Sequence, residues 1–519
     1  MKIFKFDMYK KTIFNLFLFF TIHFSLFTSL AQTTIVQTDK GKVKGFTKDN
    51  LQIFLGIPFA KPPVGDLRWK APEAMEPWKG IKECTQFSAS PFQNAPAPFA
   101  FWSSEFLIPK SPISEDCLYL NVWTKAKAQK PKAVLVYIYG GGFRSGGTAC
   151  PIYDGSNMAK EDVVFVSLNY RVGVFGFMAH PELSKESSSA SSGNYAILDL
   201  IEGLKWVKNN IHAFGGDPNQ VTIAGQSAGA SAVSILCASP LAKGLFKNAV
   251  LESGALSLVM SNPAQANEAK EKAEAAGLKL AEKLGVASLA ELRNKSAEEI
   301  QKANLGQAGP YADGYVIPFD IAGAYLAGKQ NDVNLLIGWN KDDRLSPRAL
   351  PADKYIEQIK TRFKDKADEV LQLYPATTDA IAAETQTAMS RNKFFGSKQY
   401  GLAKLQEAKG KGKIYMYRFS RDVPGFTPET QFGAFHTGDV PYFYNNLHTV
   451  NRPFEAADLQ LAKSMSQYLL NFTKTGNPSG NGLTTWPAYD QKDKKIMVLD
   501  KQLEVVHLPD EKQVEYFNK

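Results

Sequence analysis

The sequence predicts an α/β protein with a central, mostly parallel, twisted sheet flanked by helices. Beyond residue 133, short apolar runs alternate with helical patterns, and this alternation is typical of parallel strands joined by crossover helices. Short strand-like runs dominate residues 33–140, and we expect the first of them to add antiparallel strands at the N-terminal side. The 519 residues are 44% hydrophobic and 21% charged, which suits a large buried core.

The predicted elements follow one another in a regular order. Strand-like runs occupy 34–37, 42–46, 52–56, 133–139, 163–169, 249–253, 333–339 and 413–419, with one further run just before Gly225. A helix is predicted over 195–212, because its apolar residues recur at steps of four, three and four and so form one stripe that faces the sheet: Leu200, Leu204, Val207 and Ile211.

Residues 263–303 differ in composition from the rest. They are rich in Ala, Glu, Lys and Leu with few helix breakers, so we expect cap helices inserted outside the sheet. A last helix is predicted over 456–472. We therefore expect a single domain over 32–519, since one sheet with inserted loops and helices can reach this length.

The first 31 residues have the pattern of a secretory signal peptide. Four lysines precede an apolar stretch over 13–30, and Ser29-Leu-Ala31 supplies small residues at a cleavage site before Gln32. The alternative is a membrane anchor. No later stretch approaches the roughly 20 apolar residues that span a bilayer, so we expect a secreted or periplasmic protein without stable membrane insertion.

The charge of the mature chain is mildly positive. Removing residues 1–31 takes away four lysines and one aspartate, a net loss of 3, so the formal charge falls from +9 to +6. Spread over such a long chain, this surplus does not indicate nucleic-acid binding. We expect a monomer whose partner is a small-molecule or glycan-linked substrate.

A G-x-S-x-G pentapeptide, Gly225 to Gly229, follows an apolar run and precedes a helix-compatible stretch. This pattern is typical of a nucleophile elbow, in which glycines permit a sharp strand-to-helix turn and the serine is held in a strained conformation. Ser227 is the candidate nucleophile. A serine nucleophile also needs a base, an acid that orients the base, and N–H donors for the oxyanion.

The candidate oxyanion donors lie in Gly140-Gly-Gly142, directly after the strongest strand-like run. Consecutive glycines let backbone N–H groups turn toward a bound carbonyl. Among six histidines, His436 stands in a glycine-flanked loop after the run 413–419, which favours it as the base. Asp342 and Asp343 follow the run that ends at Trp339. The order Ser227, Asp343, His436 is that of the α/β-hydrolase fold.

Several further stretches in register make the chain resemble the type B carboxylesterases, the family that includes cholinesterases and p-nitrobenzyl esterases. The resemblance covers about residues 33 to 509. It rests on Phe54-Leu-Gly-Ile-Pro-Phe-Ala-Lys-Pro-Pro-Val-Gly-Asp-Leu-Arg68, Ser114-Glu-Asp-Cys-Leu-Tyr-Leu-Asn121, Tyr139-Gly-Gly-Gly-Phe143, Asn169-Tyr-Arg-Val-Gly173 and Phe214-Gly-Gly-Asp-Pro218.

The resemblance implies an α/β-hydrolase fold and a role for each candidate residue. Ser227 would be the nucleophile and His436 the base. Three N–H groups, those of Gly141, Gly142 and Ala228, would form the oxyanion hole. The family usually reads Asn-Lys-Asp-Glu-Gly where this chain reads Asn340-Lys-Asp-Asp-Arg344. Asp343 therefore takes the place of the acid with one methylene fewer, and Asp342 is the alternative.

The four cysteines are compatible with one disulfide in an exported protein. Cys84 and Cys117 enclose a segment rich in proline and aromatic residues, and their pairing matches the first disulfide of the family. We predict that bond, and we predict that Cys150 and Cys237 are buried thiols. Cys and His are too sparse for a metal site, so we expect no metal and no cofactor.

Position 226 bears on the substrate. Many relatives have Glu there, and Gln226 removes one negative charge beside the nucleophile, which disfavours a preference for cationic choline esters. The segment 281–286 also lacks the cysteine of a second disulfide that is common in relatives. The sequence thus predicts a secreted serine esterase that forms an acyl-enzyme. The alternative is an inactive binding or adhesion protein on the same fold. Short aliphatic, acetyl and feruloyl esters all remain open.

Overall fold

The computed structural model describes residues 33–110, 112–125, 130–255, 263–303, 309–345, 348–480 and 482–518. The predicted signal peptide lies outside the described residues. No helix within these ranges is long and apolar enough to cross a bilayer.

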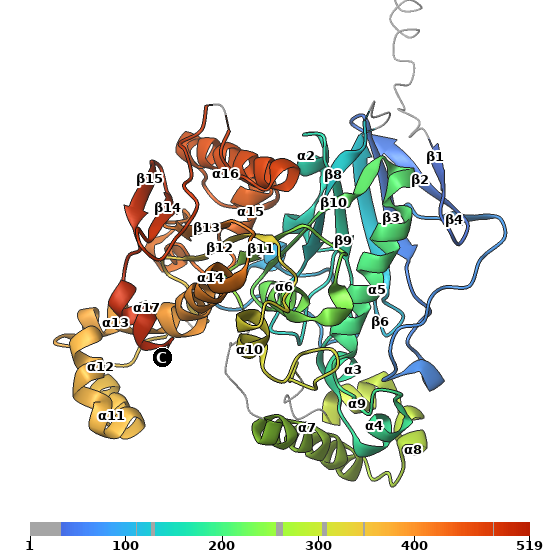
Figure 1. Cartoon of the computed structure of the whole chain (residues 1–519), viewed down its shortest axis with the longest axis horizontal. Coiled ribbons are helices and arrows are strands. Elements are labelled where there is room, and N and C mark those ends of the chain that lie inside the picture. Colours follow the sequence, from blue (N-terminus) through green and yellow to red (C-terminus); the bar gives the residue numbers. More distant parts are fainter. Residues whose placement is uncertain are drawn as a thin grey trace, which may run out of the picture.

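A 13-stranded sheet runs through the described part of the chain (Figure 1). Its order from one edge to the other is β1 (Thr33–Gln37), β2 (Lys42–Lys48), β3 (Leu51–Pro58), β7 (Tyr119–Lys125), β9 (Val164–Leu168), β8 (Lys132–Ile138), β10 (Gly216–Gln226), β11 (Asn248–Glu252), β12 (Asn334–Asn340), β13 (Ile414–Phe419), β14 (Lys495–Leu499) and β15 (Leu503–His507). The short β4 (Ile81–Glu83) pairs with β2.

The middle of this sheet is parallel and its two ends are antiparallel. Every pairing from β9 through β8, β10, β11, β12 and β13 to β14 is parallel. The pairings of β1 with β2, β2 with β3, β3 with β7, β7 with β9 and β14 with β15 are antiparallel. The predicted α/β class and the N-terminal antiparallel strands are confirmed. Parallel strands end at one edge of the sheet, so the loops after β8, β10, β12 and β13 meet there.

Helices cover both faces of the sheet. Figure 1 shows α5 (Tyr195–Asn210) and α6 (Ala228–Ala238) on one side of the strands, with α2 (Ser156–Ala159) and α16 (Ala456–Thr475) on the other. The four residues of the predicted stripe, three on α5 and Ile211 in the 3-10 turn that follows it, are all buried, as expected for the face that packs on the sheet. The helix predicted over 456–472 is α16, but it is not the last one, because α17 (Glu511–Tyr516) follows β14 and β15.

Two helical insertions extend beyond these layers at the lower edge of Figure 1. One contains α7 (Pro263–Lys283), α8 (Leu289–Arg293) and α9 (Ala297–Ala303), which confirms helices in the predicted cap region. The other contains α11 (Ala352–Phe363), α12 (Ala367–Leu373) and α13 (Asp379–Arg391). The first shares an apolar cluster with Trp69, Phe175 and Tyr195 outside it, whereas the second has a small apolar core of its own around Tyr355 and Val370.

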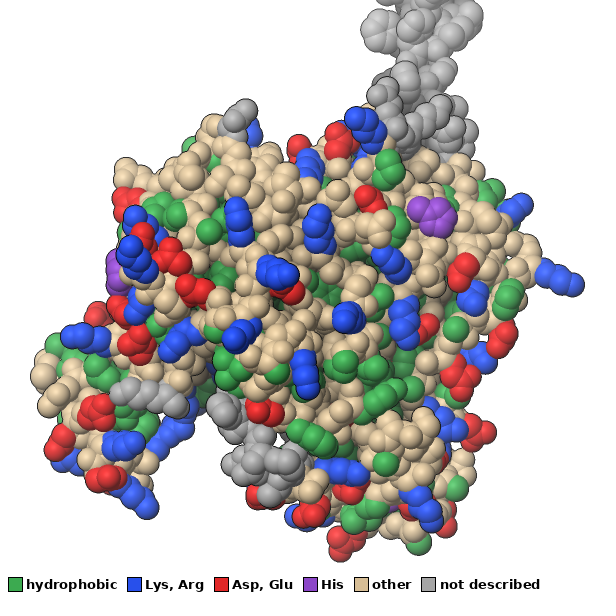
Figure 2. Space-filling model, in the orientation of Figure 1, with side chains coloured by type: hydrophobic (Ala, Val, Ile, Leu, Met, Phe, Trp, Pro, Cys, Tyr) green, Lys and Arg blue, Asp and Glu red, His purple; other side chains and the backbone are tan. Residues whose placement is uncertain are grey.

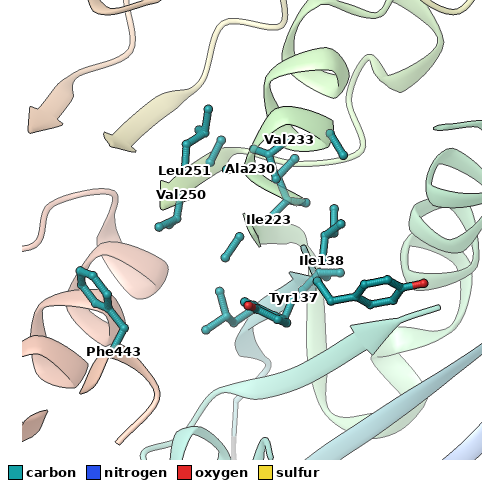
Figure 3. Packing of buried hydrophobic residues seen from close by; sticks show 14 of the residues in the cluster. Tyr137, Ile138, Ile223, Ala230, Val233, Val250, Leu251 and Phe443 are labelled. Carbon is teal, nitrogen blue, oxygen red and sulfur yellow. The ribbon is translucent and has the colours of Figure 1, made fainter. Parts of the chain in front are cut away.

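The main core is packed around the ends of the parallel strands β8, β10 and β11. Figure 3 shows Tyr137 and Ile138 of β8, Ile223 of β10, Val250 and Leu251 of β11, and Ala230 and Val233 of α6 packed against one another. All of these side chains are almost completely buried. The ends of β8, β10 and β11 are thereby fixed by close packing.

On the face seen in Figure 2, Lys and Arg side chains are interspersed with Asp and Glu.

The predicted Cys84–Cys117 disulfide is absent from the structure, where all four cysteines are buried free thiols. The two side chains have different neighbours. Cys84 Sγ lies 3.7 Å from the carbonyl oxygen of Gly56, whereas Cys117 lines a small cavity with Pro91 and Phe92. Burial raises the pKa of Cys84 to about 12, as expected for an unreactive thiol. The prediction for Cys150 and Cys237 is confirmed.

Candidate active site

The G-x-S-x-G pentapeptide forms the sharp turn between β10 and α6. Ser227 stands between the two elements with φ +57° and ψ −121°, a strained backbone conformation for a residue with a side chain. A Cβ on Gly225 would lie 2.6 Å from the carbonyl carbon of Gly229, and a Cβ on Gly229 would lie 2.1 Å from the oxygen of Ile138. Only glycine fits at both positions, so the motif is a steric requirement of this turn.

Ser227 is also fixed from the neighbouring strand. Its N–H donates to the carbonyl oxygen of Glu252 on β11 at 2.8 Å. A Cβ on Gly254 would lie 2.2 Å from the carbonyl oxygen of Ser227, so the chain after β11 passes directly against the turn. The serine is therefore held by contacts from two strands of the sheet.

His436 lies in the loop after β13 and contacts a single carboxylate. Its Nδ1 is 2.6 Å from Oδ1 of Asp343, and both side chains are buried. A carboxylate only accepts hydrogen bonds, so Nδ1 carries a proton and donates it to Asp343. Nε2 of the neutral ring is then left as the acceptor, which is the arrangement that a general base requires.

Asp342 faces away from the imidazole. Its Oδ2 accepts from the N–H of Ala434 at 2.9 Å, and its backbone bridges to Phe435. Asp342 thus joins the end of β12 to the loop that carries His436. Of the two adjacent aspartates, Asp343 is the one in contact with the base.

A buried polar network holds the histidine loop in place. Asn340, the last residue of β12, donates its backbone N–H to Asp343 Oδ2 at 3.1 Å. Its side-chain Nδ2 donates to the carbonyl of Phe435 at 2.8 Å and to Asp439 Oδ1 at 3.1 Å. Tyr417 donates its hydroxyl to the other oxygen of Asp439. Asn340 therefore links the acid to the loop of the base.

Burial raises the pKa of Asp439 to about 6. The nearby negative charge of Asp343 adds to this rise, and the hydrogen bonds from Asn340 and Tyr417 oppose it. Glu252 is also fully buried, and its pKa is raised well above the ordinary value, first by burial and then by Asp439. Its Oε1 accepts from the hydroxyl of Tyr444 at 3.0 Å.

Two aromatic rings flank the imidazole. Phe395, in a π-helical turn over Asn392–Gly396, stacks on the His436 ring with centroids 4.8 Å apart. Trp102 meets the same ring edge-on at 6.0 Å, and its indole N–H donates to Thr437 Oγ1. These contacts fix the plane of the imidazole and make its surroundings apolar.

The glycine turn after β8 lies beside the serine. A Cβ on Gly140 would lie 3.1 Å from Cβ of Ser227. Gly141 and Gly142 have φ values of +110° and +63°, which glycine adopts without steric cost. Ala228 is the first residue of α6, where a backbone N–H has no partner within the helix. The fold therefore brings the groups predicted from the sequence to one edge of the sheet.

Several residues of the site were not predicted from the sequence. Asn340, Asp439 and Phe395 belong to it, and Gln226 contacts His436 directly, with Nε2 of each side chain 3.3 Å apart. Asn340 ends the strand that precedes the acid, and Asp439 follows the base by three residues, so their positions next to the motifs were the available signals. Nothing in the spacing indicates Phe395.

Comparison with known proteins places the chain in one family. The model of the Carboxylesterase family matches residues 32–517. The chain is 35% identical to a fumonisin B1 esterase of Sphingopyxis macrogoltabida, over 90% of this chain and 86% of that protein. It is 33% identical to the para-nitrobenzyl esterase of Bacillus subtilis, over 92% and 96%, and 31% identical to a mouse cholinesterase, over 90% and 83%.

The fold agrees with these similarities. A solved structure of PNB esterase superposes with a TM-score of 0.78 at 30% sequence identity, covering 94% of this chain and all of that one. The sheet, the elbow and the histidine loop described above therefore belong to a fold whose relatives hydrolyse esters. The chain belongs to the carboxylesterase family and is a carboxylic ester hydrolase of the α/β-hydrolase fold.

Proposed function

We propose that this esterase is a serine hydrolase in which Ser227, His436 and Asp343 form the catalytic triad. The observation that carries the proposal is the 2.6 Å contact between His436 Nδ1 and Asp343 Oδ1, in a loop held against a strained serine turn. Asp343 fixes the tautomer that leaves Nε2 free to accept a proton, and its charge stabilises the imidazolium that forms during reaction.

The reaction proceeds in two halves. Nε2 of His436 takes the hydroxyl proton of Ser227 while Oγ attacks the ester carbonyl, and the imidazolium then protonates the departing alcohol oxygen. A water molecule, deprotonated by the same nitrogen, attacks the acyl-enzyme. The collapse of the second tetrahedral intermediate releases the acid and returns the proton to Ser227.

The oxyanion of each intermediate is held by the N–H groups of Gly141, Gly142 and Ala228. Three features support this role: the positive φ values of the two glycines, the approach of the glycine turn to Ser227, and the position of Ala228 at the helix N-terminus. Backbone donors fixed in place stabilise developing negative charge without reorganisation.

The substrate is a small-molecule or glycan-linked carboxylic ester. The imidazole is flanked by Phe395 and Trp102, so an apolar or aromatic group next to the scissile bond would find apolar contacts.

We further propose that residues 1–31 are a cleaved signal peptide, that residues 32–519 form one domain, and that the secreted or periplasmic protein acts as a monomer.

Replacement of the nucleophile tests the mechanism. Ser227→Ala should abolish hydrolysis of p-nitrophenyl butyrate and labelling by a fluorophosphonate probe, while its circular dichroism spectrum stays that of the wild type. Ser466→Ala, a buried serine on α16, serves as the matched control and should retain both activities. If Ser227→Ala still turned over the ester, the triad assignment would be wrong. A wild-type protein that resisted the probe would favour the alternative, a binding role for this fold.

A further inference from the structure

The side chain of Gln226 is directed at the catalytic base. Gln226 is the last residue of β10 and pairs across the sheet with Glu252 of β11. The residue is 2% exposed, and its Nε2 lies 3.3 Å from Nε2 of His436. The residue that precedes the nucleophile thus reaches the nitrogen that must accept the nucleophile's proton.

The two hydrogen-bond partners of the imidazole define a single protonation pattern. Nδ1 donates to Asp343, so the neutral ring offers only a lone pair at Nε2. An amide NH₂ group matches that lone pair, whereas an amide oxygen or a carboxylate would match a protonated Nε2. The geometry at position 226 therefore favours the neutral, Nδ1-protonated ring that serves as a base.

The oxyanion turn shapes the space for this amide. A Cβ on Gly140 would lie 2.6 Å from the backbone oxygen of Gln226 and 3.1 Å from its Oε1. The glycine turn can therefore lie directly against the glutamine because residue 140 has no side chain. The amide is enclosed between the turn that holds the oxyanion and the ring of the base.

We propose that Gln226 is a positioning residue that holds His436 in its reactive tautomer and, because it is uncharged, keeps the esterase active at lower pH than a carboxylate at this position would allow. This inference rests on the proposed function. Ser227 Oγ replaces the amide at Nε2 when the proton is transferred, so the glutamine contact belongs to the resting enzyme.

The other groups around the imidazole determine how much charge it already experiences. Asp343 faces Nδ1 from the loop after β12, and Phe395 and Trp102 cover the ring. Two further carboxyl groups belong to neighbouring residues: Asp439, bonded to Asn340, and Glu252, paired with Gln226, both with raised pKa values. A carboxylate at position 226 would thus be a second negative charge within hydrogen-bond distance of the ring. An opposite charge at that distance stabilises the protonated form by about 1 to 3 pH units.

Two substitutions separate the charge from the hydrogen bond. Gln226→Glu should move the acid limb of kcat/KM for p-nitrophenyl butyrate upward by at least about one pH unit. Gln226→Met keeps the volume and removes the donor without adding a charge, so its acid limb should stay where it is in the wild type, while the ¹⁵N NMR signals of His436 should shift toward the Nε2-protonated tautomer. Gln406→Met is the matched control, because Gln406 is a buried glutamine that bonds at the opposite end of β12 to Asp332 and Val333, and it should leave kcat and the pH profile unchanged.

The outcomes separate this inference from the proposed function. The rate of fluorophosphonate labelling is measured against pH for all four proteins, together with their thermal unfolding. An acid limb of Gln226→Glu that superposes on the wild type, or ¹⁵N signals of His436 that do not change in Gln226→Met, would overturn the positioning role while labelling of the wild type still supported the triad. Equal changes in kcat and KM without a shift of the acid limb would also contradict it. Absence of labelling in the folded wild type would refute the triad itself.

Discussion

At the scale of single residues, Asp343 shows how backbone contacts compensate for a short side chain. Asp343 has one methylene fewer than the glutamate common in the family, yet its Oδ1 lies 2.6 Å from His436 Nδ1. Its other oxygen accepts from the N–H of Asn340, so the carboxylate is held at two points. A short side chain with few rotatable bonds also loses little conformational entropy when it is fixed.

Asp343→Asn should reduce kcat by about 10³- to 10⁴-fold, because an amide at this position can stabilise the wrong tautomer of His436 and carries no charge. Asp342→Asn should reduce kcat by less than about tenfold, since that carboxylate bonds only to the backbone of the histidine loop. Steady-state kinetics on one ester distinguishes the two. The reverse ranking would transfer the role of the acid to Asp342.

The residues of the site differ in how far the sequence could predict them. Ser227, His436 and Asp343 were predictable because each stands in a motif at the end of a strand-like run. Phe395 and the contact of Gln226 with His436 depend on how α14 (Ser397–Lys409) and the histidine loop pack against the sheet. That packing is tertiary, and no local spacing encodes it. Cys84 was misassigned for the same reason, since separation along the chain does not reveal which side chains face each other.

At the scale of elements, the glycine turn after β8 contains two neighbouring residues with unequal constraints. A Cβ on Gly141 would lie 2.2 Å from the carbonyl oxygen of Ser145, at a φ of +110°. Gly142 has a φ of +63° and nothing within 4 Å of the corresponding position. The first glycine is therefore required by packing and conformation, and the second only by conformation.

Gly141→Ala should displace the turn and reduce kcat by about 10²-fold or more, the usual effect of losing an oxyanion donor. Gly142→Ala should retain kcat within roughly tenfold, because the left-handed conformation costs an alanine only about 1 kcal/mol. Both variants are compared in kcat and in thermal unfolding. A similar loss of kcat in the two would show that the clash with Ser145 does not determine the position of the donors.

At the scale of the whole molecule, buried carboxyl groups couple folding to pH. The pKa of Asp439 is about 6 in the folded protein against an ordinary value of 3.8, so the folded state binds this proton more tightly than the unfolded chain does. The resulting stabilisation is complete below about pH 4 and is lost as the pH rises through 6. A rise of roughly two pH units corresponds to about 3 kcal/mol.

Asp439→Asn removes this titration. The unfolding free energy of the variant minus that of the wild type should therefore increase by up to about 3 kcal/mol between pH 4 and pH 7. Urea denaturation at several pH values measures the difference, and any constant effect of the substitution cancels. A difference that does not change with pH would mean that the carboxyl titrates alike in the folded and unfolded states.

The architecture as a whole was predictable to the level of class. Apolar runs that alternate with helical patterns predicted the parallel strands, and composition predicted the cap helices over 263–303. The order of the strands in the sheet could not be predicted from the sequence. The position of β8 between β9 and β10 depends on the crossover connections and not on any local pattern. The insertion over 352–391 was not foreseen either, since its small core around Tyr355 and Val370 is visible only once its helices pack together.

The attachment of Ser227 to two strands has a consequence for how this protein can vary. Ser227 is located by Gly225, Gly229 and Gly254 and by the hydrogen bond to Glu252, all within the sheet or at its rim. Neither helical insertion supplies any of these contacts. The insertions could therefore be lengthened, exchanged with those of a relative or redesigned around a new ester while the position of the reacting oxygen stayed the same, which makes the rim of this sheet a fixed platform for altered specificity.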